Sequence, residues 1–213
     1  MPADYSSNFP LYWDGVDKLW LEKVREIFFT PTKGVIGISK RYNTIIDGRL
    51  HLGLWPDAPS ANITYLLHEM GHFIEIDNAR CHLPDWGLKA GKWNKFFNCS
   101  EGMVTNKAIE RELRVFAIER YIASICDMVP KSFEYDASIC RHIDGFISYG
   151  DSDLTDYSEK QKSAEQNIAK RIELLTAEWN EEKVISAWFN KVKVLNKKGK
   201  LKGFDYHQDK MAA

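Results

Sequence analysis

The chain has 213 residues, of which 44% are hydrophobic and 13% aromatic, so it can bury a sizeable core and is not globally disordered. A formal net charge of −1 argues against a protein that coats nucleic acid along its whole length. The four cysteines form no CxxC pair, and no apolar run is long enough to span a membrane. Because no signal-like N-terminus is seen, reduced thiols in a cytoplasmic protein are expected.

The first 54 residues predict a helix followed by a small sheet. Apolar residues share one face of a helix over about 16–29, which Asp14 can cap and Thr30-Pro31 ends. A short strand over 35–39 comes next, and then a hairpin over 44–54 around a tight Asp47-Gly48 turn. The strand 49–54 is a candidate edge for an extended peptide, although its pattern suits a buried strand equally well.

The next helix contains the motif His68-Glu-Met-Gly-His72. Its apolar residues form one stripe, and the two histidines lie on the opposite side; the stripe consists of Ile63, Leu66, Leu67, Met70, Phe73 and Ile74. Histidines four apart on a helix differ by about 40° around its axis and about 6 Å along it, so both can bind one zinc ion. Glu69 can then act as the general base toward the zinc-bound water.

A second long helix is predicted over 104–128, and it is apolar on nearly every side, so its carboxylates need a partner or a metal. The C-terminal third shows three further helical stripes, at 133–147, 164–179 and 184–192. Residues 191–202 contain six lysines and no acid, which suits either a solvated, frayed tail or contact with a phosphate backbone.

A catalytic zinc ion normally has three protein ligands and a fourth position for water. The candidates for the third ligand are Glu110, Glu112 and Glu119 on the second long helix, and His82. Glu112 and Glu119 lie within about 20° of each other on an otherwise apolar face, whereas Glu110 points about 160° away from Glu112. Glu112 is therefore preferred, with an ion pair to a neighbouring arginine as its alternative role. Glu75 is too near its own helix and suits a hydrogen bond to a ligand histidine instead.

The chain resembles the zincin metallopeptidases, and among them the gluzincins, which bind zinc through both histidines of HExxH and a downstream glutamate. More distantly, Leu67-His-Glu-Met-Gly-His72 and Glu110-Arg-Glu-Leu-Arg-Val-Phe-Ala117 resemble the ImmA/IrrE-like peptidases, with Leu113-Arg114 where that family has Ala-Asn. The resemblance covers about residues 35–130. It implies zinc ligands His68, His72 and Glu112, with Glu69 as the base. A SprT-like arrangement, with His82 as third ligand and DNA-linked proteins as substrates, is the alternative.

The expected fold is α+β and zincin-like, with a small antiparallel or mixed sheet over the HExxH helix and a mostly helical C-terminal half. Residues 1–130 would form the catalytic core, and 131–213 a helical part packed on it with a lysine-rich tail. The expected function is zinc-dependent hydrolysis of a peptide bond in a protein substrate. Tyr or His side chains would stabilise the oxyanion, the candidates being Tyr65, Tyr149, Tyr157, His51 and His142.

Two other functional classes stay open on the sequence alone. One is a binding or regulatory protein on a zincin scaffold, with little or no peptidase activity, that contacts protein or nucleic acid through its helical part or its lysines. The other is a helical protein without zinc, in which HExxH is accidental. The zinc content of the purified protein separates this last class from the first two.

Overall fold

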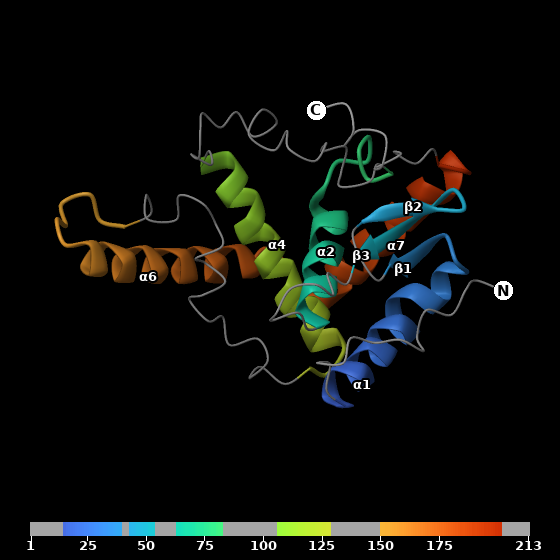
Figure 1. The fold of residues 1–213 in the computed structure, drawn as a ribbon, viewed down its shortest axis with the longest axis horizontal. Helices are drawn as coiled ribbons and strands as arrows, with labels where there is room; N and C mark the ends of the chain where they lie inside the picture. The colour runs from blue at the N-terminus through green and yellow to red at the C-terminus, as the bar shows by residue number, and fades with distance from the viewer. Residues whose placement is uncertain (1–14, 40–42, 54–62, 83–105, 129–149, 202–213) are drawn as a thin grey trace, which may run out of the picture. The chain divides into compact units, whose positions relative to one another are not determined.

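The computed structural model describes residues 15–39, 43–53, 63–82, 106–128 and 150–201 (Figure 1). Within these ranges the protein is α+β and mostly helical, with five α-helices and one three-stranded mixed sheet. The chain divides into two compact units, residues 1–87 with 185–213 and residues 88–184. None of the helices in the described ranges combines the length and the apolar character that a membrane crossing requires.

The first unit begins with helix α1 (Gly15–Val24), which runs on through a π-helical turn, η2 (Arg25–Phe29), and a 3₁₀ turn, η3 (Thr30–Thr32). The wider π turn places two consecutive aromatic residues, Phe28 and Phe29, in the core. Pro31 stands at the start of the 3₁₀ turn, and Lys33 follows in the left-handed region at φ 53°, where the helical path ends. The helix predicted over about 16–29 is therefore confirmed.

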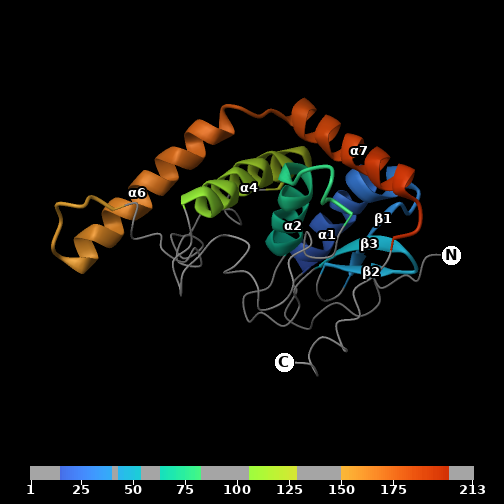
Figure 2. The ribbon, with the colours of Figure 1, turned by 90° about the horizontal axis from the view of Figure 1, so that it is seen from above.

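The sheet consists of β1 (Ile36–Ser39), β2 (Thr44–Ile46) and β3 (Arg49–Gly53) in the order β1-β3-β2 (Figure 2). β2 and β3 form the predicted hairpin, and both turn residues have positive φ, 51° at Asp47 and 77° at Gly48, as a type I′ turn requires. β1 lies on the other side of β3 and runs parallel to it. The suggestion that strand 49–54 is an edge is wrong, because β3 is hydrogen-bonded on both sides.

The two faces of β3 have different surroundings. Leu50 and Leu52 are fully buried in the core, and β3 contacts the HExxH helix. His51 alternates to the opposite face, where its ring covers Gly37 of β1; a Cβ at Gly37 would come within 2.4 Å of that ring. The absence of a side chain at Gly37 therefore makes room for the imidazole.

The HExxH helix is α2 (Ile63–Glu75), and every member of its predicted apolar stripe is buried. It packs against β3 and α1. The two histidines, on the other side, are each half-buried. The 3.6-residue period thus orients this helix, with its stripe in the core and its histidines facing away from that core.

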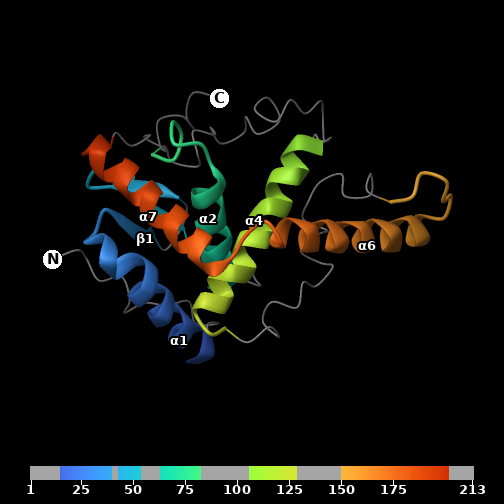
Figure 3. The same cartoon turned by 180° about the vertical axis from the view of Figure 1, so that it is seen from behind.

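Helix α7 (Glu181–Lys198) supplies, from Ile185 onward, the last layer of the first unit (Figure 3). Trp188 is fully buried and meets Phe28, Phe29 and Phe73 edge-on, with ring centroids 5.6, 5.2 and 5.1 Å away. Its indole N–H donates to the carbonyl of Phe28 at 2.9 Å. One side chain thereby joins α7 to both η2 and α2.

The end of α7 corrects the expectation of a frayed lysine-rich tail. The helix continues to Lys198, and Val192 and Leu195 on it are buried. Lys191 donates a hydrogen bond to the carbonyl of Ile76, just beyond α2. After the helix, the amide of Leu201 donates to the carbonyl of Gly48 in the hairpin turn at 2.8 Å. These apolar and polar contacts hold a segment whose composition alone suggests solvation.

The second unit contains α4 (Asn106–Ile125) and α6 (Tyr157–Thr176), which pack against each other. Asp156 caps α6 by accepting the amide of Glu159 at 3.0 Å. Tyr121 on α4 donates its hydroxyl to the carbonyl of Thr176 at 3.1 Å. α4 is buried over much of its circumference, as the apolar pattern at 104–128 predicts. The stripe predicted at 133–147 lies outside the described residues.

Candidate metal centre

The two histidines of α2 are brought together by their helical spacing. Their Nε2 atoms lie 3.1 Å apart, and the rings stand nearly perpendicular, at 89°. Two nitrogens bound to one tetrahedral zinc ion at about 2.0–2.1 Å would be separated by about 3.3 Å. A shift of a few tenths of an ångström would thus let His68 and His72 bind one ion, each through its own Nε2 atom.

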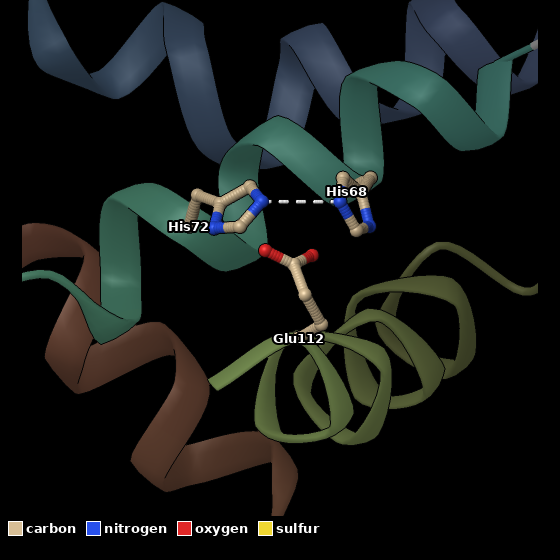
Figure 4. A group of neighbouring side chains, drawn as sticks. All are labelled: His68, His72 and Glu112. Carbon is tan, nitrogen blue, oxygen red and sulfur yellow. Dashed lines mark hydrogen bonds between the residues drawn. The ribbon is translucent and has the colours of Figure 1, made fainter. Parts of the chain in front are cut away.

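His68 and His72 on α2 and Glu112 on α4 form a group of side chains that could hold a metal ion (Figure 4). One ligand atom from each of His68, His72 and Glu112 lies within 4.8 Å of the others, and all three residues are half-buried. In the described part of the chain, this is the one group of three His, Cys, Asp or Glu side chains so arranged. The group includes Glu112, the residue preferred on helical geometry, and its role as a zinc ligand stays a prediction.

The other candidates for the third ligand stand apart from this group. Glu110 is held by Arg171 of α6 in a two-pronged ion pair, with nitrogen–oxygen distances of 2.9–3.2 Å. Glu119 is buried, with 5% of its surface exposed, and is not a member of the group. Nor is His82, whose pKa is lowered by burial and, to a lesser degree, by the charge of Lys198.

Glu69, the predicted general base, is buried, with 8% of its surface exposed. One of its carboxylate oxygens, Oε2, accepts a hydrogen bond from the side-chain amide of Asn43, directly before β2. The side-chain oxygen of Asn43 in turn accepts the backbone N–H of Gly53 at 2.8 Å. Asn43 carries no sequence signal of this contact, because an asparagine beside a strand is usually a turn residue and its partner lies 26 positions away.

A cluster of charged and sulfur-containing side chains lies at the C-terminal end of α2. Burial lowers the pKa of Lys191, and electrostatic interactions with Cys81, Asp77 and Glu75 raise it by a smaller amount. Burial raises the pKa of the Cys81 thiol, and the nearby charges of Lys191 and Lys198 lower it by a smaller amount. Cys81 and Cys126 are both free thiols, as expected for reduced cysteines, while the other two cysteines lie outside the described residues.

The candidates for an oxyanion-stabilising residue are spread over the chain. His51 lies on the sheet, near the carbonyl of Ile38, at 3.5 Å, and burial lowers its pKa. Tyr65 is half-buried on α2, and Tyr157 is 67% exposed at the start of α6. Tyr149 and His142 lie outside the described residues. The geometry therefore assigns none of them to the role.

Comparison of the chain with protein-family models, with curated proteins and with solved structures finds no match in any of the three. The resemblance to zincins and to the ImmA/IrrE-like peptidases accordingly stays a prediction.

Proposed function

We propose that this protein is a zinc-dependent metallopeptidase of zincin type. In this proposal His68, His72 and Glu112 hold the zinc ion, and Glu69 is the general base. The observation on which it chiefly depends is that one possible ligand atom from each of these three residues lies within 4.8 Å of the others. Two imidazoles and one carboxylate are a common donor set of catalytic zinc, and they leave a fourth position for water.

The same three donors also suit Fe(II), so the donor set alone does not select zinc. The neighbouring glutamate favours a hydrolytic site. Glu69 follows His68 directly in the chain, and its carboxylate is kept out of bulk water and oriented by Asn43. A buried, oriented base one residue from a metal ligand suits the activation of a water molecule.

A bound zinc ion would supply Lewis acidity, which acidifies a water molecule and polarises a substrate carbonyl. The side chains of the protein would carry out the proton transfers and hold the metal ion. The Glu69 carboxylate would take up the proton from the water. The same carboxylate would then return the proton to the leaving amine. His68 and His72 must be neutral at Nε2 to act as ligands, so metal binding should weaken as the pH falls.

The substrate in this proposal is a protein or peptide in extended conformation. Because β3 is central, β1 and β2 are the outer strands of the described sheet, and we assign the edge role to β2. β2 begins directly after Asn43, whose side chain contacts the base. A peptide added along β2 by main-chain hydrogen bonds would therefore run close to Glu69.

The first experiment measures the metal content of the purified full-length chain and cleavage of a peptide library by the zinc-loaded protein. Glu69→Gln should keep one zinc per chain and abolish cleavage, because the amide cannot accept the proton. Asp77→Asn is a matched control: it removes a carboxylate just after the same helix, is exposed, and should retain activity. Cleavage at near wild-type rate by Glu69→Gln would refute the mechanism.

Two other outcomes point to different classes of protein. Zinc well below one per chain, with no stabilisation on adding zinc, would indicate a protein in which the motif binds no zinc. One zinc per chain with no cleavage by the wild type would indicate a binding or regulatory protein on the same scaffold.

A further inference from the structure

Asn43 connects the predicted catalytic base to the sheet. It is buried, with 2% of its surface exposed, and both ends of its carboxamide are hydrogen-bonded. Nδ2 donates to Oε2 of Glu69 on α2, and Oδ1 accepts the amide of Gly53 at the end of β3. A single side chain therefore joins the HExxH helix to the central strand, close to the proposed site.

The orientation of this carboxamide is determined by its two partners. The backbone N–H of Gly53 can only donate, so it must face the oxygen of the amide. The amide nitrogen must then face Glu69, whose carboxylate accepts. A reversed amide would place two donors together at Gly53 and two acceptors together at Glu69, so only one orientation satisfies both contacts.

We propose that Asn43 is a positioning residue that holds the Glu69 carboxylate in the orientation required for proton transfer. Because Oε2 is bonded to an amide that is itself fixed on β3, rotation of the carboxylate about its last side-chain bond is restricted. This inference depends on the proposed function, in which the Glu69 carboxylate exchanges the proton. A buried carboxylate also needs a donor, and Asn43 supplies one without adding a charge.

Two substitutions separate positioning from a purely structural role in the sheet. Asn43→Asp keeps an oxygen for the Gly53 amide but presents a second carboxylate to Glu69. Asn43→Ala removes both hydrogen bonds. Thr44→Ala, at the next position, is the matched control, because it alters the start of β2 and leaves the Asn43 carboxamide in place. If Asn43 only secures the sheet, both variants should be less stable to unfolding, while the folded, zinc-loaded protein keeps its kcat.

On the positioning role, both Asn43 variants should lower kcat by about 10–100-fold, the range typical of residues that orient a catalytic group. KM should stay within about twofold, zinc should remain at one per chain, and Thr44→Ala should keep its kcat. A wild-type kcat in Asn43→Asp, or a change confined to KM, would overturn the inference.

A second readout needs no substrate. In the NMR spectrum of the zinc-loaded full-length chain, the Asn43 side-chain amide protons should exchange slowly with water and should shift upfield on Glu69→Ala. Asp77→Asn should leave them unchanged. If the wild type cleaves no peptide, the proposed function fails, whereas this amide signal still decides whether Asn43 holds Glu69. An Asn43 amide signal insensitive to Glu69→Ala would overturn the inference.

Discussion

Replacing Glu112 by Gln tests whether it is the third ligand, and the size of the effect follows from the site. Structural zinc sites with four protein ligands bind with about 10–16 kcal/mol, or about 2.5–4 kcal/mol per ligand. At about 1.4 kcal/mol per tenfold change, losing one ligand weakens zinc binding by about 100- to 1,000-fold. Gln keeps the volume of Glu and a neutral oxygen, so we expect a loss near 100-fold.

The assay is competition between apo-protein and a chromophoric chelator at constant pH. Glu110→Gln, on the same helix, is the matched control. Glu110 is bound to Arg171, and the two side chains are 26% and 39% exposed, so this ion pair contributes at most about 1 kcal/mol to stability. Its loss should leave the zinc affinity within about twofold. Equal zinc affinity in Glu112→Gln and the wild type, or an equal loss in both variants, would refute the assignment.

Two further predictions concern the first unit and can be checked by urea unfolding of the apo-protein. Trp188→Ala should lower the free energy of unfolding by about 3–5 kcal/mol. Trp188→Phe keeps an aromatic ring but loses the hydrogen bond to the Phe28 carbonyl, so it should lower this free energy by only about 1–3 kcal/mol. Equal losses in the two variants would contradict separate contributions from the ring and the hydrogen bond. Burial lowers the folded-state pKa of His51 below its unfolded value, so the unfolded chain binds the proton first. The wild type should therefore lose more stability than His51→Leu as the pH falls below about 6.5, and parallel pH profiles would contradict this.

Local periodicity and turn chemistry account for the features that the sequence predicts correctly. The stripe from Ile63 to Ile74 is buried because a helix has one period, and that period places His68 and His72 opposite the core. Asp47-Gly48 forms the hairpin turn because both positions need positive φ.

Features that depend on contacts distant in sequence could not be predicted in this way. The parallel pairing of β1 with β3 leaves no mark in either strand, so the sequence pattern could not decide whether β3 is an edge strand or a buried one. Arg171 lies 61 residues from Glu110, and the chain offers several other arginines as partners. Asn43 has the composition of a turn residue, and only the approach of α2 to the sheet reveals its bond to Glu69.

Trp188 contacts residues 160 positions earlier in the chain, and this has a consequence for synthesis on the ribosome. Phe28, Phe29 and Phe73 leave the ribosome long before the ring that covers them. Until α7 emerges, the HExxH helix has an apolar flank without its final layer, and the nascent chain exposes those aromatic rings to solvent and to chaperones. Long sequence separation between contacts also slows folding. The HExxH helix would therefore acquire its complete packing only after α7 has been synthesised.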